Sequence, residues 1–191
     1  MIGLLMAGGA STRMGTDKGL LLDKAGKLWA KKTFELLEKG NLSCFVSLNS
    51  SQLDTYQAHF SIKSLVIDNS KIPVKGPLLG ILSVHQQFPK EDLFALATDL
   101  PYLSFAQIER LLVFREQNPK RGIWVYRSHK GPEPLCAIYS ARILAQILSA
   151  PPQKFSLTAL LDQFPTAYLP ILPEEMDNFE NVNFPIYGKS L

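Results

Sequence analysis

The sequence has few of the residues that most often build metal and redox sites, with two cysteines and three histidines among its 191 residues. Cys44 and Cys136 stand alone, without a C-x-x-C spacing, so they suggest neither a zinc site nor a redox pair. His59, His85 and His129 fall at unrelated places without ligand spacing. We therefore expect both cysteines to be small core residues and the histidines to be core or solvated side chains.

Long runs of one kind of residue are missing as well. Charged residues make up 19% of the chain and its net charge is +3, with no block of lysines or arginines that could follow a nucleic-acid backbone. The apolar run at residues 2–7 has no basic residues ahead of it and is too short for a signal peptide or a membrane span. We therefore expect a cytoplasmic protein without a nucleic-acid or membrane partner.

The composition that remains is that of a globular domain. Hydrophobic residues make up 46% of the chain, and 191 residues can bury a sizeable core without metals or disulfides. No internal repeat and no long polar linker divides the sequence. We therefore expect a single domain over residues 1–191.

Short apolar runs alternate with longer stretches of helical periodicity, the pattern of a mostly parallel sheet covered on both faces. The pattern predicts an α/β fold, a Rossmann-like three-layer αβα sandwich with a mostly parallel sheet. We expect strands at residues 2–6, 44–48, 64–67, 93–97, 123–126 and 135–139, and helices at residues 28–39, 77–87, 104–118, 141–149 and 156–163. The proline-rich tail from Pro165 onward is expected to be irregular.

A glycine-rich segment follows the first strand directly. Gly8 and Gly9 let the backbone approach a ligand closely and point successive N–H groups at phosphate oxygens. Arg13 and Lys18 add positive charge to the same segment. The spacing matches neither the G-x-x-x-x-G-K-[ST] loop nor the G-x-G-x-x-G fingerprint. Two glycines alone are more typical of an ordinary strand-to-helix turn with solvated charges, but the full segment with its two cations favours a site for a triphosphate.

An aspartate stands at the end of the strand expected at residues 93–97. Asp99 lies in the segment Thr98-Asp99-Leu100-Pro101, at the carboxyl end of a central strand, where open α/β sheets place their ligands. Magnesium prefers hard oxygen ligands and is held by one or two carboxylates together with substrate phosphates. Asp99 is therefore our candidate magnesium ligand, and the alternative is an aspartate that caps the following turn.

Two further places could meet an anion. Gly76 precedes Pro77 at a helix start, where free N–H groups and the positive end of the helix point toward a ligand. Near the carboxyl end of the chain, the amides of Asn181 and Asn183 could bind a phosphate or an ordered metal water, or could equally hold the backbone of a turn.

These motifs resemble those of one enzyme family. Residues 6–18, Met-Ala-Gly-Gly-Ala-Ser-Thr-Arg-Met-Gly-Thr-Asp-Lys, are similar to the L-A-G-G-x-S-x-R-M-G-x-D-K signature of molybdenum cofactor guanylyltransferases. Residues 75–81 resemble the family's G-P-L-A-G-I, residues 98–101 its C-D-x-P, residues 133–139 its x-P-L-x-A-x-Y, and residues 181–185 its N-x-N-T-P. The chain departs from the family at Thr98, at Phe184, at Ser47, where many members carry asparagine, and at residues 26–29, which lack the usual proline.

The resemblance implies a fold like that of nucleotide-diphospho-sugar transferases and a reaction that moves GMP from GTP to molybdopterin, releases pyrophosphate and uses Mg²⁺. It implies catalytic roles for Arg13, Lys18 and Asp99, with Asp99 as the metal ligand, and weaker acceptor-binding roles for Asn181 and Asn183. It assigns nucleotide binding to Met6, Ala7, Gly8, Gly9, Lys18, Ser47, Asn49, Asp68, Gly76 and Asp99.

It also divides the domain into a nucleotide-binding half at residues 1–103 and an acceptor-binding half at residues 104–191. The implied partners are GTP, molybdopterin and other molybdenum cofactor biosynthesis proteins, with the chain itself a monomer or weak oligomer. Two alternatives stay open: a cytidylyl- or sugar-phosphate nucleotidyltransferase of the same fold, and a non-catalytic nucleotide-binding module.

Overall fold

The strands of the chain form one sheet in the order β3-β2-β1-β4-β6-β5-β7. The computed structural model describes residues 1–7 and 17–181. Within them the strands are β1 (Ile2–Met6), β2 (Ser43–Leu48), β3 (Leu65–Ile67), β4 (Leu93–Ala97), β5 (Ile123–Ser128), β6 (Gly131–Tyr139) and β7 (Thr166–Pro170). The sheet is mostly parallel, as the sequence predicts.

Strand direction decides which residues meet at each edge of the sheet. β1 pairs in parallel with β2 and β4, and β2 pairs in parallel with β3. β6 is antiparallel to both of its neighbours, β4 and β5, whereas β7 is parallel to β5. The carboxyl ends of β1, β2, β3 and β4 therefore share one edge with the beginning of β6.

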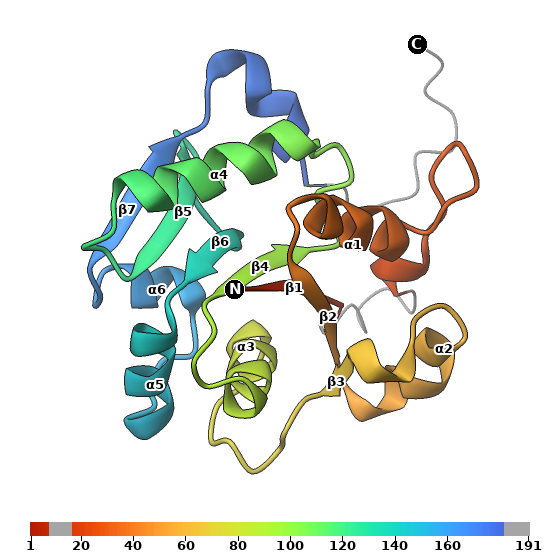
Figure 1. Cartoon of the computed structure of the whole chain (residues 1–191), viewed down its shortest axis with the longest axis horizontal. Coiled ribbons are helices and arrows are strands. Elements are labelled where there is room, and N and C mark those ends of the chain that lie inside the picture. The colour runs from red at the N-terminus through yellow and green to blue at the C-terminus, as the bar shows by residue number, and fades with distance from the viewer. Residues whose placement is uncertain (8–16, 182–191) are drawn as a thin grey trace.

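Helices cover both faces of this sheet, so the chain has the three layers expected from the sequence (Figure 1). The helices are α1 (Trp29–Lys39), α2 (Leu53–Gln57), α3 (Pro77–Gln87), α4 (Phe105–Gln117), α5 (Ala141–Ser149) and α6 (Leu157–Leu161). The core between the sheet and α3, α5 and α6 is separate from the core under α1 and α4. A smaller cluster joins α1, α2, β1 and β2.

The central strands are apolar throughout because both of their faces are buried. In β1, Leu4 and Met6 pack into the core under α3, whereas Leu5 packs on the opposite side with α1 and α2. Every residue of β1 and of β4 is buried. The two neighbouring strands are therefore held in the core along their whole length, and their carboxyl ends lie side by side.

The expectation of an irregular tail is wrong for residues 166–179. Residues 166–170 form β7, with Ala167 and Leu169 buried against the core, and Pro173–Phe179 is a 3-10 helix. β7 is an edge strand whose register with β5 is set by long-range pairing. Its Pro170 falls at the end of the strand, a position that proline tolerates.

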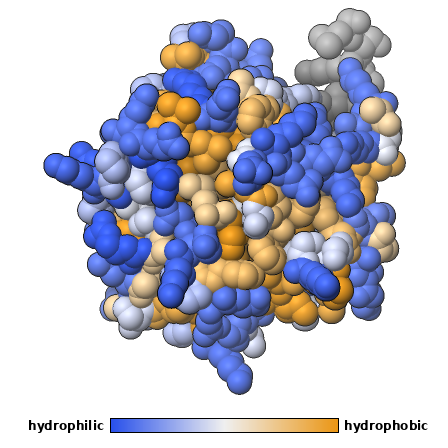
Figure 2. All heavy atoms as spheres, viewed as in Figure 1, coloured by the Kyte–Doolittle hydropathy of each residue, from blue (hydrophilic) through white to orange (hydrophobic). Residues whose placement is uncertain are grey.

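Hydrophilic residues cover the outward sides of the helices in the space-filling view, and hydrophobic residues show through between the two helical layers (Figure 2). Among residues 1–7 and 17–181, no helix has both the length and the apolar character needed to cross a membrane.

Candidate active site

Lys18 and Asp99 meet at the edge where the parallel strands end. Lys18 opens the 3-10 helix Lys18–Leu20 after β1, and Asp99 follows the end of β4. Lys18 Nζ lies 3.7 Å from Asp99 Oδ2, and the two side chains are 22% and 24% exposed. A cation and a carboxylate thus stand together, and both side chains are partly exposed to a ligand.

A second carboxylate, Glu133, faces the same place from β6. Leu96 of β4 pairs with Cys136 of β6, and because the strands are antiparallel, Asp99 and Glu133 continue from this pair toward the same end of the sheet. Burial of Glu133 raises its pKa, and the negative charge of Asp99 raises it further. The two carboxylates therefore interact electrostatically beside Lys18.

Glu133 begins the motif at residues 133–139, for which the family resemblance implies no role of this carboxylate. Its place depends on the antiparallel pairing of β6, and the β5–β6 register shifts between Val125 and Arg127 alongside this stretch. Only the pattern of a strand in the second half of the chain was available from the sequence.

These groups fit a magnesium ion that takes most of its ligands from substrate and water. The oxygens of Asp99 and Glu133 are hard donors, and Mg²⁺ is normally held by one or two carboxylates plus phosphates. No group of three or more His, Cys, Asp or Glu side chains suited to a metal occurs among the described residues. Two carboxylates beside a lysine suit a cation that takes its other ligands from a nucleotide and from water.

The segment that carries Asp99 is tied to α1. Lys32 Nζ donates a hydrogen bond to the Pro101 carbonyl oxygen at 2.7 Å. Leu100 and Leu103, which flank this contact, are buried in the core under α1 and α4. The backbone that follows Asp99 is therefore fixed by a charge-assisted bond as well as by packing.

Asp68 and Ser47 form a polar pair at the ends of β3 and β2. Ser47 Oγ donates to Asp68 Oδ1 at 3.0 Å. Burial raises the pKa of Asp68, and the hydrogen bond from Ser47 opposes this shift. A Cβ atom on Gly80 of α3 would lie 2.2 Å from Ser47 Oγ and 2.9 Å from Met6 Cε, so glycine is required for this close approach.

The remaining predicted contacts lie around this edge in different settings. Asn49 caps a short 3-10 helix, with its Oδ1 accepting from the backbone N–H of Ser51 at 3.0 Å. Gly76 is the exposed N-cap of α3 with φ of 65°, a conformation that glycine adopts without strain. Asn181 is exposed. Ala7 directly follows β1, and its N–H donates to the Ser47 carbonyl oxygen at 3.0 Å.

Four of the predicted site residues lie outside the described residues: Gly8, Gly9, Arg13 and Asn183. Their roles stay predictions.

The cysteines and histidines take the positions expected of them. Cys136 is buried in the core, and Cys44 packs partly buried against it. Burial, followed by the charge of Glu38, raises the pKa of Cys44 to about 12, so this thiol is protonated at neutral pH. His85 is buried in α3, whereas His59 and His129 are exposed.

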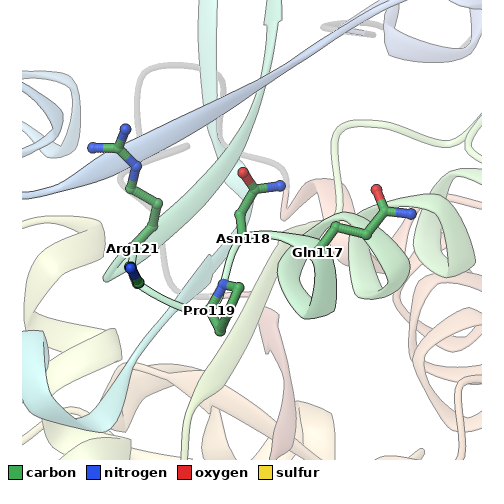
Figure 3. Close-up of a pocket in the computed structure, with 5 residues that line it drawn as sticks. Gln117, Asn118, Pro119 and Arg121 are labelled. Carbon is green, nitrogen blue, oxygen red and sulfur yellow. The ribbon is translucent and has the colours of Figure 1, made fainter.

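A hollow of about 510 Å³ lies at the loop between α4 and β5, lined by residues 117–121 (Figure 3). This loop precedes β5, which runs in the same direction as β4 because both are antiparallel to β6. The hollow is therefore at the opposite edge of the sheet from Asp99. Its walls come from one short stretch of chain, and it shares no residue with the candidate site.

The carboxyl-terminal edge of an open α/β sheet is where ligands bind, and in this chain that edge carries Lys18, Asp99 and Glu133. The chain matches the model of the MobA-like NTP transferase domain over residues 3–167. It belongs to this family, and it is a nucleotidyltransferase.

A curated relative agrees with this assignment, and solved structures show the same fold. A molybdenum cofactor guanylyltransferase of Campylobacter jejuni is 31% identical over 184 residues, which cover 95% of this chain and 90% of the relative. The crystal structure of molybdopterin-guanine dinucleotide biosynthesis protein A from Archaeoglobus fulgidus has a TM-score of 0.73 at 19% identity, covering 97% of this chain and 93% of that one. A Mycobacterium tuberculosis protein in complex with manganese has a TM-score of 0.62 at 14% identity, covering 89% of this chain and 87% of that one.

Proposed function

We propose that this enzyme transfers GMP from GTP to molybdopterin and releases pyrophosphate, forming molybdopterin guanine dinucleotide. The observation that carries the proposal is the approach of Lys18 to Asp99 at the carboxyl ends of adjacent parallel strands. Ligands of open α/β sheets bind at this edge. The name of the Campylobacter jejuni relative supplies the choice of GTP and of the molybdenum cofactor as substrates.

The acceptor needs no activation by a covalent enzyme intermediate. A terminal phosphate on molybdopterin is already an anionic nucleophile at neutral pH, and it would attack the α-phosphorus of GTP while pyrophosphate leaves. Catalysis then consists of positioning and of stabilising negative charge. Lys18 is suited to the triphosphate because its ammonium lies 3.7 Å from Asp99 Oδ2 and its side chain is partly exposed.

Asp99, with Glu133 beside it, would hold Mg²⁺. A bound divalent cation at such a site neutralises charge on the phosphates during transfer. The manganese complex of the Mycobacterium tuberculosis neighbour supports the use of a divalent cation on this fold. Asp68, which accepts a hydrogen bond from Ser47, would be a further polar anchor for the nucleotide.

The proposal is tested by supplying molybdopterin with each of GTP, CTP, UTP and ATP in the presence of Mg²⁺ and measuring pyrophosphate release. We expect GTP to be preferred and EDTA to abolish release, because the phosphates lose their cation. Lys18→Ala is expected to weaken GTP binding or transfer, with the exposed Lys63→Ala as a control variant.

Preference for CTP would favour the cytidylyltransferase alternative. Binding of nucleotide with no pyrophosphate release, despite supplied acceptor, would favour a non-catalytic module. A diffraction dataset from crystals soaked with GTP and Mg²⁺ would then locate the contacts to the base.

A further inference from the structure

Asp17 collects three hydrogen bonds next to Lys18. Its Oδ1 accepts from the Gly19 backbone N–H at 2.9 Å and from the Tyr56 hydroxyl at 3.0 Å. Its Oδ2 accepts from Gln52 Nε2 at 2.6 Å. A carboxylate that accepts several donors is held in one rotamer, because rotation would break all of these bonds together.

Gln52 connects this carboxylate to the end of β1. Its Nε2 also donates to the Ala7 carbonyl oxygen at 3.0 Å, and its Oε1 accepts from the Asn49 backbone N–H at 3.0 Å. The Asn49 bond orients the amide, so both hydrogens of Nε2 point toward the other two partners. One side chain therefore joins Ala7, directly after β1, to Asp17, directly before Lys18.

Tyr56 supplies a rigid support for the same group. The Tyr56 side chain, in α2, is fully buried among residues of α1, β1 and β2. Burial, and then the charge of Asp17, raises the pKa of Tyr56, so its hydroxyl keeps its proton and remains a donor. A Cβ on Gly19 would lie 2.2 Å from the Tyr56 hydroxyl oxygen, so the turn after Lys18 needs glycine for this approach.

These contacts link three separate segments at one point. β1 ends at Met6, the turn carrying Lys18 begins at Asp17, and Gln52 and Tyr56 come from the connection between β2 and β3. The same edge of the sheet carries Asp99 at the end of the neighbouring strand β4. The position of Lys18 relative to Asp99 thus depends on side chains distant from both in sequence.

We propose that Gln52 and Tyr56, acting through Asp17, are positioning residues that hold Lys18 beside Asp99 in the geometry needed for nucleotidyl transfer. The inference rests on the proposed function for its catalytic consequence. The geometric part, that these bonds fix the Lys18 turn, stands independently of it.

The test uses the full chain and three variants. Gln52→Leu removes the bonds to Ala7 and Asp17, and Tyr56→Phe removes one hydroxyl without changing the ring. Gln57→Leu is the matched control, because Gln57 is exposed and lies in α2 directly after Tyr56. Hydrogen exchange is followed at the amides of residues 19–21, and kcat and KM for GTP are measured well below each variant's Tm.

We expect Gln52→Leu to lower kcat by about 10²-fold, since a misplacement of about 1 Å can cost that much. Tyr56→Phe is expected to lower kcat by roughly tenfold, because the link from Asp17 through Gln52 to Ala7 remains. Exchange at residues 19–21 should be faster in both variants and unchanged in Gln57→Leu. A purely stabilising role would lower Tm and leave kcat at the wild-type value.

A reciprocal exchange of the two groups tests the bond itself. Gln52→Glu alone places a second carboxylate against Asp17, and Asp17→Asn alone places an amide N–H₂ group against Gln52. The double variant Asp17→Asn/Gln52→Glu restores a donor and an acceptor across this contact but not the bond to the Ala7 carbonyl oxygen, so its loss of kcat should be smaller than the product of the two single losses. Losses that simply multiply in the double variant would contradict the proposal.

The proposal is overturned if folded Gln52→Leu and Tyr56→Phe keep both wild-type kcat and wild-type exchange at residues 19–21. If Gln52→Leu does not fold, Tyr56→Phe and the reciprocal pair decide the matter. A wild-type chain that is inactive with every NTP would overturn the proposed function, and the exchange measurements would still decide whether these bonds fix the Lys18 turn.

Discussion

Replacing Asp99 by asparagine should separate catalysis from stability. The carboxylate attracts the Lys18 ammonium at 3.7 Å and repels Glu133, so removing its charge loses one favourable contact and one unfavourable contact. A partly exposed ion pair is worth about 0.2–1 kcal/mol, and relief of the repulsion offsets some of that loss. We expect the free energy of unfolding to change by less than about 1 kcal/mol.

The effect on turnover should be much larger. Charge stabilisation by a bound cation is worth several kcal/mol in the transition state. Each 1.4 kcal/mol or so corresponds to a factor of ten in rate, so Asp99→Asn should lower kcat by at least about 10³-fold. A variant that folds like the wild type but does not turn over is the expected result.

The two effects can be measured on the same samples. A ligand at about 100 times its Kd stabilises a protein by roughly 2.7 kcal/mol, which for a domain of this size raises Tm by about 5–10 °C. Wild type should show this shift with Mg²⁺ and GTP, and Asp99→Asn should lose most of it. Full pyrophosphate release by Asp99→Asn, or an undiminished Tm shift, would refute the assignment of Asp99 as the metal ligand.

Three further changes test the site and its surroundings. Glu133→Gln should lower kcat about 10–100-fold, as loss of a group beside a metal ligand does, while the exposed Glu109→Gln should not; equal activity of the two variants would remove Glu133 from the site. Gly80→Ala should cost about 1–3 kcal/mol in urea unfolding and weaken nucleotide binding, because its Cβ would lie 2.2 Å from Ser47 Oγ. Burial lowers the pKa of His85 in the folded chain, so its imidazole binds a proton more readily in the unfolded chain. The free energy of unfolding should therefore fall as the pH drops below about 6.5, the pKa of histidine in the unfolded chain. His85→Leu should show a shallower loss of stability between pH 7.5 and 5.5 than wild type, and an unchanged pH slope would refute that cause.

The sequence predicted most closely those elements whose ends are marked by local chemistry. Pro77 opens α3, whose residues 77–87 match the prediction, and Ser140 caps α5, whose residues 141–149 also match. The capping box of Ser104 and Gln107 likewise begins α4. In contrast, α2 is a five-residue helix, too short for its periodicity to be distinguished from a loop.

The residues of the candidate site also differ in how far the sequence could predict them. Lys18 and Asp99 could be placed together because parallel strands deliver their carboxyl ends to one edge. Glu133 could not be placed at this edge from the sequence, because its position depends on one antiparallel strand with an irregular register. Gln52 could not be predicted as part of the site either, since a lone glutamine in a polar stretch gives no sign of a hydrogen-bond partner in a distant segment. Asn49, expected at the nucleotide, also caps a short helix that the sequence did not reveal.

The reversal of β6 also has a consequence for how such enzymes diversify. Because β6 runs against its neighbours, the tight turn that joins it to β5 at residues 128–131 opens at the same rim as Asp99. Lengthening that hairpin would add new surface next to Asp99 and Glu133 and leave the seven-stranded scaffold untouched. A single surface connection could therefore reshape one side of the candidate site without any change in the strands that carry it.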